Sequence, residues 1–439
     1  MNIVVAGTGY VGLVTGVCLA EKGHNVTCVD VNQEKIDLMK KCKSPIYEKD
    51  LEELMKKNKD RLDYTTDAHT AYKNADVIFI GVGTPEKKDG SANLKYVYDV
   101  GREIAQSIEK DCIVVLKSTV PIGTNKKIEK YINSNAKNNV KVELVSNPEF
   151  LSQGTAVHDT LYAQRIVIGV KSKRAEEIMR KVYDAFEIEY VITDRESAEM
   201  IKYASNDFLA LKVSYINEIA NLCEIVGANI TDVAKGMGLD SRIGNKFLNA
   251  GIGYGGSCFP KDTKALNWLG NYYDYELKTV KAAIEVNENQ KIKLIKKARK
   301  YYDSFEGLNV AVLGLSFKPN TDDLREAPSL ECIPILLDDG AKVKAYDPVA
   351  EENYKKIYPT EIEYCNSVEE TLKDTDICLI FTEWDFVKNM DVSLFEKLMR
   401  KPIILDGRNC FELNKLEDKN IIYESIGRKK VNNFKLKIL

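Results

Sequence analysis

The sequence predicts an α/β protein in which two doubly wound, parallel-sheet domains are joined by a central helical domain. Short apolar runs alternate with amphipathic segments near the N-terminus and again from about residue 309. Between them, residues 197–227 contain neither proline nor an internal glycine. Alternating strands and helices are typical of βαβ units and therefore of a parallel sheet. At roughly 150 residues per domain, a chain of 439 residues is long enough for three domains.

The first domain is assigned to residues 1–194. A glycine-rich turn follows its first apolar run, and a helix then extends to about Lys22. The runs that predict its strands are Asn2–Ala6, Val26–Asp30, Val77–Gly81, Ile113–Leu116 and Val142–Val145. Their separation by helical patterns predicts parallel pairing.

The central domain is assigned to residues 195–302, and its core is the long segment 197–227. Apolar residues recur there at helical spacing, which predicts one long helix. The α/β pattern then returns as an echo, since Gly23–Asp30 resembles Gly340–Asp347 in sequence. Residues 303–439 are therefore predicted to form a second, related α/β domain. The Lys- and Asn-rich tail after Gly427 is predicted to be frayed.

Composition excludes several classes of function. The 63 Lys and Arg nearly balance the 66 Asp and Glu, so no global field favours nucleic acid or an anionic membrane. The ten cysteines form no Cys-x-x-Cys pair, which indicates reduced thiols in a cytoplasmic protein without a metal site. Residues 3–20 are uncharged but contain four glycines, with no basic residue before them, so we expect neither a membrane span nor a signal peptide.

The strongest local motif is Gly7-x-Gly9-x-x-Gly12, which follows a strand and opens a helix. The glycines permit a tight turn, a close approach of the pyrophosphate and close packing of helix on strand. Asp30 ends the next strand, where it can accept hydrogen bonds from the adenosine ribose and repel a 2′-phosphate. The sequence therefore predicts a Rossmann-like site for NAD rather than NADP.

Three later loops also follow predicted strands of this domain. They contain Thr84, Thr119 and Glu149. Because ligands bind at the carboxyl ends of parallel strands, we expect these loops to reach the same crevice as the glycine turn.

The segment 253–262 is the candidate for covalent chemistry. Its glycines let backbone approach a ligand and leave Cys258 accessible, and the nearby Lys261 can lower the pKa of the thiol. Asp262 lies four residues further on. Lys202 and Asn206 are spaced i,i+4 on the long predicted helix, a spacing that by itself indicates only a solvated surface pair.

Together these segments resemble the UDP-glucose/GDP-mannose dehydrogenase family. The matching stretches are Gly7–Gly12, Gly81–Pro85, Ser118–Gly123, Asn147–Leu151, Ile201–Asn206, Gly253–Asp262 and Gly314–Asp323. The resemblance implies a two-step, four-electron oxidation of the C6 alcohol of UDP-glucose to UDP-glucuronate by NAD. It further implies a thiohemiacetal and a thioester on Cys258. The family also implies a homodimer formed through the central helical domain.

The resemblance assigns roles residue by residue. In catalysis it implies Cys258 as nucleophile, Lys202 and Asn206 as oxyanion donors (with Lys202 also a proton acceptor), Glu149 as acid/base, and Thr119 and Asp262 as groups that position water. The residues that it implies for NAD are Gly7, Gly9, Tyr10, Val11, Gly12, Asp30, Lys35, Thr84, Thr119, Glu149, Lys261 and Arg325. Those that it implies for the nucleotide sugar are Glu149, Phe150, Leu151, Lys202, Asn206, Arg242, Phe247, Leu248, Asn249, Ala250, Gly251, Gly255 and Lys318, with Arg242 acting across the dimer.

The chain departs from the family pattern at Ser152-Gln153, at Ala163-Gln164 and at Asp207, where a small residue is usual. Three alternatives stay open. The first is the same chemistry on UDP-N-acetylmannosamine or GDP-mannose, against which Lys261 is an argument. The second is a two-electron hydroxyacid-type dehydrogenase, and the third is a non-catalytic nucleotide sensor.

Overall fold

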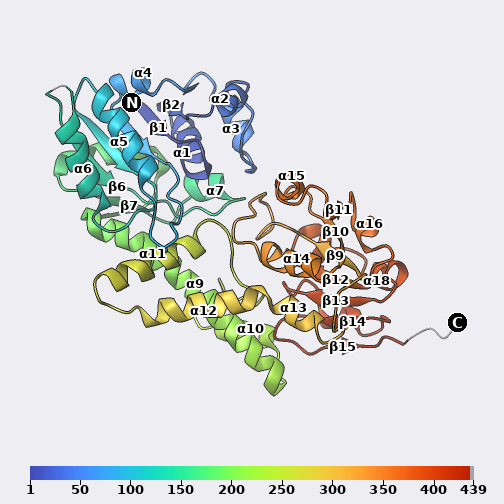
Figure 1. The fold of residues 1–439 in the computed structure, drawn as a ribbon. Coiled ribbons are helices and arrows are strands. Elements are labelled where there is room, and N and C mark those ends of the chain that lie inside the picture. Colours follow the sequence, from blue (N-terminus) through green and yellow to red (C-terminus); the bar gives the residue numbers. More distant parts are fainter. Residues whose placement is uncertain (138, 436–439) are drawn as a thin grey trace. The chain divides into compact units, whose positions relative to one another are not determined.

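The computed structural model describes residues 1–137 and 139–435. The chain separates into two compact units, each with its own sheet (Figure 1). The first unit consists of residues 1–205 and 264–275, and the second of residues 206–263 and 276–439. The division of the chain into three domains at residues 194 and 302 stays a prediction.

The first unit is built on an eight-stranded sheet of order β3-β2-β1-β4-β5-β6-β7-β8. Its strands are β1 (Asn2–Ala6), β2 (Asn25–Val29), β3 (Leu62–Thr65), β4 (Val77–Ile80), β5 (Cys112–Leu116), β6 (Val142–Ser146), β7 (Ile166–Gly169) and β8 (Tyr190–Thr193). All neighbours pair in parallel except β6 and β7. The doubly wound parallel sheet is therefore confirmed, although the apolar runs did not predict β3, β7 or β8.

Helices cover both faces of this sheet because its strands are apolar on both faces. In β1, Ile3 and Val5 pack in one core and Val4 and Ala6 in another. The helices are α1 (Tyr10–Glu21), α2 (Gln33–Lys40), α3 (Leu51–Lys57), α4 (Ala68–Lys73), α5 (Lys95–Ser107), α6 (Thr124–Asn135), α7 (Ala156–Leu161) and α8 (Lys173–Tyr183), with a 3₁₀ turn, η1, at Asp184–Phe186. Burial on both faces is typical of a doubly wound sheet.

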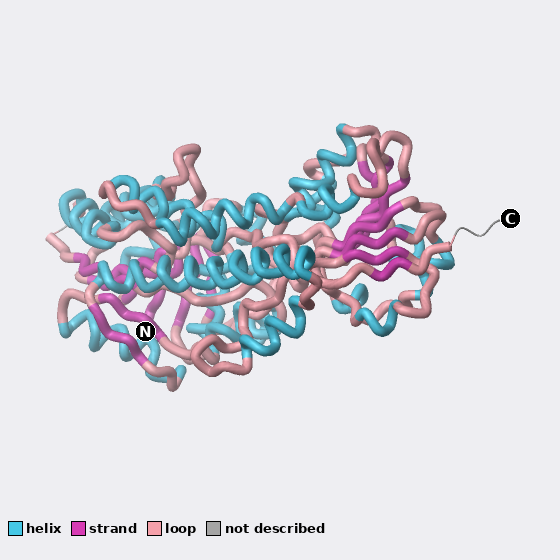
Figure 2. The backbone as a smooth tube through the Cα atoms, turned by 90° about the horizontal axis from the view of Figure 1, so that it is seen from below, coloured by secondary structure: helices cyan, strands magenta, loops and turns pink. Residues whose placement is uncertain are grey.

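The second unit is built on a seven-stranded sheet of order β11-β10-β9-β12-β13-β14-β15. Its strands are β9 (Asn309–Leu313), β10 (Lys342–Tyr346), β11 (Ile362–Tyr364), β12 (Ile377–Ile380), β13 (Ile403–Asp406), β14 (Ile422–Glu424) and β15 (Val431–Asn432). The order β11-β10-β9-β12-β13 repeats the order β3-β2-β1-β4-β5, so the predicted echo between the two α/β halves is present in the topology. Figure 2 shows these strands running side by side between helical segments.

The helices of the second unit lie on this sheet and beside it. They are α10 (Ile230–Gly238), α12 (Lys278–Lys291), α13 (Lys293–Ala298), α14 (Pro328–Asp338), α15 (Glu351–Lys355), α16 (Val368–Leu372), α17 (Asp385–Lys388) and α18 (Ser393–Leu398), with a 3₁₀ turn, η2, at Leu413–Leu416. In β9, Val310 and Val312 pack in one core and Ala311 and Leu313 in the other.

The prediction of a frayed tail after Gly427 was wrong for residues 428–435. Val431 and Asn432 form β15, which pairs antiparallel with β14. The Arg428 guanidinium donates hydrogen bonds to the Tyr423 hydroxyl and the Phe411 carbonyl. The composition of the tail did not reveal these tertiary contacts. Residues 436–439 lie outside the part of the chain that the structure describes.

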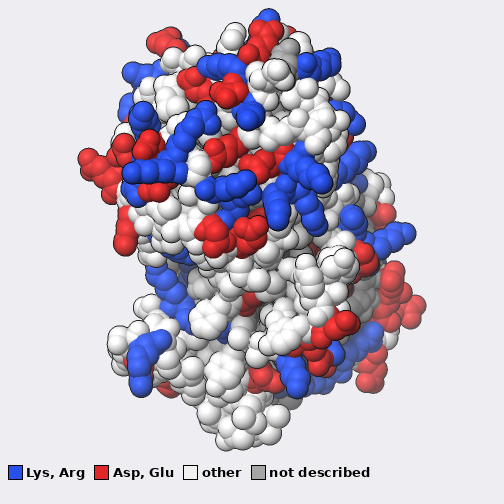
Figure 3. All heavy atoms as spheres, turned by 90° about the vertical axis from the view of Figure 1, so that its left-hand side faces the viewer, with Lys and Arg blue, Asp and Glu red and all other residues white. Residues whose placement is uncertain are grey.

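The long helix predicted over 197–227 is confirmed as α9 (Arg195–Val226). Like α11 (Phe259–Tyr272), it contributes residues to both units. Across residues 1–137 and 139–435, no helix combines the length and the apolar character needed to cross a bilayer. Figure 3 shows basic and acidic side chains interleaved on one face of the molecule, in line with the net charge of -3.

Candidate active site

The glycine turn between β1 and α1 has the geometry that the motif predicts. Gly7 has φ +93°, a conformation that favours glycine. A Cβ on Gly12 would lie 1.9 Å from the carbonyl oxygen of Gly7, so only glycine lets the helix pack this closely. At Gly9 a Cβ would meet nothing within 4 Å. The turn is therefore tight on its protein side and open where the motif requires room for a pyrophosphate.

Asp30 lies directly after β2 and is joined to this turn. Its carboxylate accepts hydrogen bonds from the backbone N–H of Thr8 (2.9 Å) and from the Thr8 hydroxyl (2.5 Å). The backbone N–H of Asn32 donates to the other oxygen at 3.0 Å. Burial opposes ionisation of Asp30, but these hydrogen bonds and the charge of Lys35 outweigh it, so the pKa of the carboxyl lies below its ordinary value. Asp30 is thus an anion at neutral pH.

Two of the later loops meet as predicted. The Thr84 hydroxyl, after β4, donates a hydrogen bond to the carbonyl of Thr119, after β5, at 2.8 Å. Thr84 is buried and Thr119 half-buried. At the start of α1, Tyr10 and Val11 are half-buried. These residues and the glycine turn all follow the carboxyl ends of parallel strands of one sheet, where ligands bind in doubly wound folds.

Glu149 and Lys202 form a buried ion pair in the first unit. The Lys202 ammonium lies 2.9 Å from the Glu149 carboxylate, and their side chains are 3% and 6% exposed. The backbone N–H of Leu151 donates to the second carboxylate oxygen at 2.7 Å. Lys202 also lies 5.3 Å from the centre of the Phe150 ring, and Arg165 lies 4.1 Å from the same centre. The spacing of Lys202 and Asn206 indicated only a solvated surface pair, yet both residues are buried.

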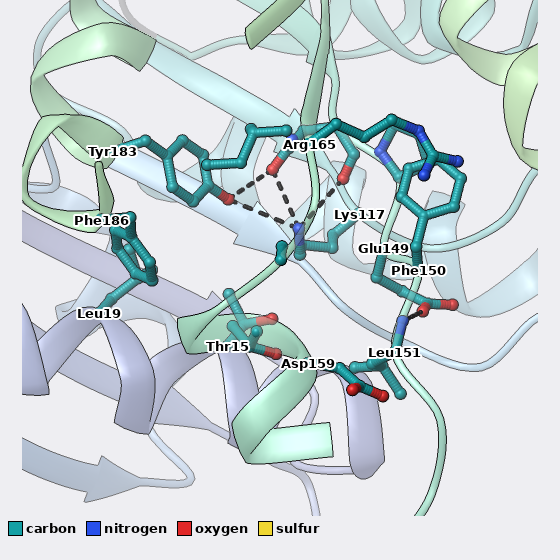
Figure 4. A pocket seen from close by; sticks show the side chains of 15 residues that line it. Thr15, Leu19, Lys117, Glu149, Phe150, Leu151, Asp159, Arg165, Tyr183 and Phe186 are labelled. Atoms are coloured by element: carbon teal, nitrogen blue, oxygen red, sulfur yellow. Dashed lines mark hydrogen bonds between the residues drawn. The ribbon is translucent and has the colours of Figure 1, made fainter. Parts of the chain in front are cut away.

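Lys117, at the end of β5, is a functional candidate that the sequence analysis missed. It is buried and lines the same pocket as Glu149, Phe150 and Tyr183 (Figure 4). Its ammonium donates to the Asn147 side-chain oxygen at 3.1 Å, and the Tyr183 hydroxyl donates to the same oxygen at 2.6 Å. Burial lowers the pKa of Lys117 to about 8, although the charge of Glu149 acts in the opposite direction. A lysine directly after an apolar strand run was the available sequence signal.

In the second unit, Cys258 lies just before α11 and is half-buried. The hydroxyl of Ser257 lies 3.8 Å from its sulfur. The Asn206 amide donates to the Asp262 carboxylate at 2.7 Å, and the Lys261 ammonium forms an ion pair with the same carboxylate. Asn206 and Asp262 are therefore brought together, whereas their roles in the reaction stay predictions. Lys261 is held by Asp262, so the expected effect of Lys261 on the thiol stays a prediction.

The other cysteines provide a contrast. All ten are free thiols, and seven of the remaining nine are buried. Burial raises the pKa of Cys28 and of Cys112 to about 12, so both are neutral thiols. Cys258 is half-buried, as are Cys42 and Cys410, and it differs from all nine by its position between a glycine-rich loop and a helix.

The glycine loop before Cys258 is fixed by two asparagines. The backbone N–H of Gly251 donates to the side chain of Asn217 at 2.8 Å. The Asn287 side chain accepts from the N–H of Tyr254 at 2.8 Å and donates to its carbonyl at 3.1 Å. A Cβ on Gly255 would lie 2.4 Å from the carbonyl oxygen of Glu326, so the loop packs too closely for any other residue.

A cavity of about 770 Å³ opens beside this loop in the second unit. Its lining includes Phe247, Asn249, Gly255 and Lys318, four of the residues assigned to the nucleotide sugar. Arg408, which was not among the predicted site residues, also lines it. The Arg408 guanidinium donates to the carbonyls of Gly253 (3.0 Å) and Phe317 (3.1 Å) and so fixes two walls of the cavity. No motif pointed to this arginine, because its partners are backbone carbonyls distant in sequence.

Other assigned residues lie elsewhere. The side chains of Leu248 and Ala250 pack in the hydrophobic core. Arg242 is exposed and pairs with Asp240 at 2.6 Å. Arg325 pairs with Asp323 at 2.7 Å. Within residues 1–137 and 139–435, no three His, Cys, Asp or Glu side chains are placed to hold a metal ion.

Comparison with known proteins covers nearly the whole chain. Three models of the UDP-glucose/GDP-mannose dehydrogenase family match: the NAD binding domain at residues 1–187, the central domain at 196–289 and the UDP binding domain at 311–413. UDP-glucose 6-dehydrogenase YwqF of Bacillus subtilis is 48% identical over 98% of each chain. A UDP-glucose dehydrogenase structure from Pyrobaculum islandicum is 36% identical with a TM-score of 0.91, covering 97% of this chain and 98% of its own. A UDP-D-ManNAc dehydrogenase structure from Pyrococcus horikoshii is 26% identical with a TM-score of 0.84, covering 98% and 99%.

Proposed function

Because the chain belongs to the UDP-glucose/GDP-mannose dehydrogenase family, we propose that it oxidises the C6 alcohol of UDP-glucose to the carboxylate of UDP-glucuronate with NAD. The observation that carries this proposal is the half-buried Cys258 thiol, which lies next to a glycine loop and beside the Asn206–Asp262 pair. A two-electron dehydrogenase needs no such thiol, whereas a double oxidation needs a way to retain the aldehyde.

The first unit is suited to NAD. The open position at Gly9 leaves room for a pyrophosphate, and the close packing at Gly12 lets the helix N-terminus approach it. The anionic Asp30 suits a ribose that carries no 2′-phosphate. When bound, NAD accepts one hydride in each of the two oxidation steps. Thr84, Thr119 and Lys35 are proposed as further contacts.

In the first oxidation the Lys202–Glu149 pair accepts the hydroxyl proton, and Lys202 and Asn206 donate hydrogen bonds to the oxygen. The sulfur of Cys258 adds to the aldehyde carbon, and the oxygen takes up the proton to form a thiohemiacetal. Loss of a second hydride and of that proton leaves a thioester.

Hydrolysis completes the reaction. A water positioned by Thr119 and Asp262 attacks the thioester carbon, Glu149 accepts its proton, and the Cys258 thiolate departs. The sugar carboxylate is then free to leave. The cavity lined by Phe247, Gly255 and Lys318 is proposed to hold the nucleotide sugar.

Sequence identity to structures of known specificity favours UDP-glucose over the other nucleotide sugars as substrate. The UDP-glucose dehydrogenase structure is closer to this chain than the UDP-D-ManNAc dehydrogenase structure, at 36% against 26% identity. The family resemblance also implies that Lys261 favours a glucose enzyme. Ser152 and Gln153, where the chain departs from the family pattern, flank the loop assigned to the substrate, so we propose them as positions that influence the sugar preference.

The proposed function predicts two NADH formed per UDP-glucose consumed. Absorbance of NADH and chromatography of the nucleotide sugar measure this ratio directly, with UDP-N-acetylmannosamine and GDP-mannose as parallel substrates. A ratio of one would replace the double oxidation by the two-electron alternative. A faster reaction with either parallel substrate would transfer the assignment to that sugar. No NADH with any of the three would favour the nucleotide sensor.

We also propose that the protein is a homodimer formed through α9. Phe208, Tyr215 and Leu222 follow one another at intervals of seven residues, and they are 62%, 47% and 52% exposed. Such a stripe is the pattern by which one helix packs against another. Leu239 and Ile243, which follow α10, add further exposed apolar surface in the same unit. A second copy of the chain is the partner that the family implies.

Introducing charge into this stripe should produce monomers. The double variant Phe208→Glu, Leu222→Glu places two buried charges in the proposed interface, which weakens association by several kcal/mol, or about 10³-fold or more. Light scattering coupled to gel filtration gives the mass. Ile357→Glu is the control, because Ile357 is 48% exposed and lies outside the stripe. A monomeric wild-type protein, or a dimeric double variant, would contradict the proposal.

We place the activity in the cytoplasm. The ten cysteines are all free thiols, which suits a reducing compartment. The near-balanced charge and the interleaved charges in Figure 3 give no support for nucleic acid or an anionic membrane as a partner.

A further inference from the structure

Asp207 is a buried acid that directly follows Asn206 on α9. Its side chain is 5% exposed, and neither carboxyl oxygen has a hydrogen-bond partner within residues 1–137 and 139–435. Burying a polar group without a partner is unfavourable, and burying an unpaired carboxylate is far more so. Asp207 is therefore expected to keep its proton. The chain therefore places a protonated acid, Asp207, directly beside Asn206, a residue assigned to catalysis.

The surroundings of Asp207 differ from those of the neighbouring acid Asp262. Asp262 on α11 is the charged group that acts on it, and Tyr254 in the glycine loop also faces it. Asp262 is 1% exposed, and its carboxylate accepts a hydrogen bond from the Asn206 amide and forms an ion pair with the Lys261 ammonium. Burial first, and then the charge of Asp262, raise the pKa of Asp207 to about 8. Among the residues that the structure describes, Asp207 lacks the hydrogen bond and the ion pair that Asp262 has, so Asp207 is the acid that keeps its proton.

We propose that Asp207 is a positioning residue of the Cys258 segment, which holds a proton in the resting protein and whose ionisation weakens the hydrogen bond from Asn206 to Asp262. An ionised Asp207 would place a second negative charge beside Asp262. It would repel that carboxylate and compete for Lys261 and for the Asn206 amide. The consequence for catalysis rests on the proposed function, whereas the proton itself does not.

The pH dependence of turnover tests the catalytic part. Asp207→Asn replaces the acid by a group of similar shape that cannot ionise. We expect the ratio of its kcat to that of the wild type to rise about threefold or more between pH 7 and pH 9, as the wild type loses its proton. Asp303→Asn is the matched control, because Asp303 is exposed. Parallel pH profiles of Asp207→Asn and wild type would overturn this role.

Stability tests the proton without any substrate. Between about pH 4 and pH 8 the unfolded chain has lost the Asp207 proton and the folded protein keeps it, so the wild type loses stability as the pH rises through this range. Asp207→Asn and Asp207→Ala lack this titration, and any cavity or repacking effect acts equally at each pH. The Tm difference, variant minus wild type, should increase by on the order of 5 °C from pH 5 to pH 8. An unchanged difference would overturn the proposal.

The two measurements fail separately. Absence of NADH formation with UDP-glucose would contradict the proposed function, and the Tm series would still decide whether Asp207 holds a proton. If the Tm difference depends on pH but the kinetic profiles are parallel, Asp207 holds a proton but has no effect on the reaction. That outcome would reject the positioning role.

Discussion

Replacing Cys258 with serine is expected to reduce UDP-glucuronate formation by about 10³-fold or more. A cysteine thiol ionises far more readily than a serine hydroxyl, which supplies essentially no alkoxide at neutral pH. Because Cys258 is half-buried and outside the hydrophobic cores, the substitution should change the stability by less than about 1 kcal/mol. Substrate binding, measured by calorimetry, should stay within about threefold of wild type, since the thiol acts after binding.

Cys42→Ser is the matched control for this variant. Cys42 is also a free, half-buried thiol, but it packs against the core of the first unit rather than beside a glycine loop. Its variant should retain the wild-type rate and the two-to-one ratio of NADH to nucleotide sugar. Full double oxidation by Cys258→Ser would reject the covalent mechanism and favour direct oxidation of a hydrated aldehyde.

The parts of the fold that the sequence predicts are those in which local pattern and tertiary structure agree. The glycine motif requires a strand before it and a helix after it, and β1 and α1 supply both. The long run 197–227 contains no helix breaker, so the helical spacing of its apolar residues predicts a single uninterrupted helix. The echo between Gly23–Asp30 and Gly340–Asp347 is visible because both segments turn from a helix into a strand.

The missed parts depend on contacts between distant segments. β3 alternates apolar and polar residues, β8 is only half-buried, and β15 has only two residues, so each is defined by its pairing rather than by a buried apolar run. Periodicity cannot show such pairing. The tail was mistaken for a frayed end for the same reason.

The same limit applies to the candidate site. Lys117 and Arg408 act through backbone carbonyls and amide oxygens, which carry no sequence signal. The spacing of Lys202 suggested a surface residue, because spacing says nothing about what packs over a helix face. Lys202 is buried together with its partner Glu149, a residue of a different segment that its spacing on the helix could not indicate.

Replacing Glu149 with glutamine should lower both activity and stability. The variant leaves the Lys202 ammonium, 3% exposed, without its carboxylate. Removing one partner of a buried pair costs about 3–5 kcal/mol, which corresponds to a Tm decrease on the order of 10 °C. Loss of the acid/base group should also reduce kcat by about 10²-fold or more. Thermal unfolding without ligands and NADH formation measure the two effects.

The exposed pair Lys73–Glu109 provides the matched control for stability. Its side chains are 44% and 50% exposed and its separation is 2.9 Å, the same as in the buried pair. Because exposed ion pairs contribute little, Glu109→Gln should change stability by less than about 1 kcal/mol. Equal Tm changes in the two variants would show that Glu149 does not compensate a buried charge.

The double variant Glu149→Gln, Lys202→Met separates the two effects. It removes the unpaired ammonium, so most of the stability lost in Glu149→Gln should return. Activity should not return, since neither the proton acceptor nor the oxyanion donor is restored. A fold that recovers while turnover stays absent would mean that the pair is retained for chemistry rather than for stability. Recovery of turnover along with Tm would instead assign Glu149 and Lys202 a purely structural part.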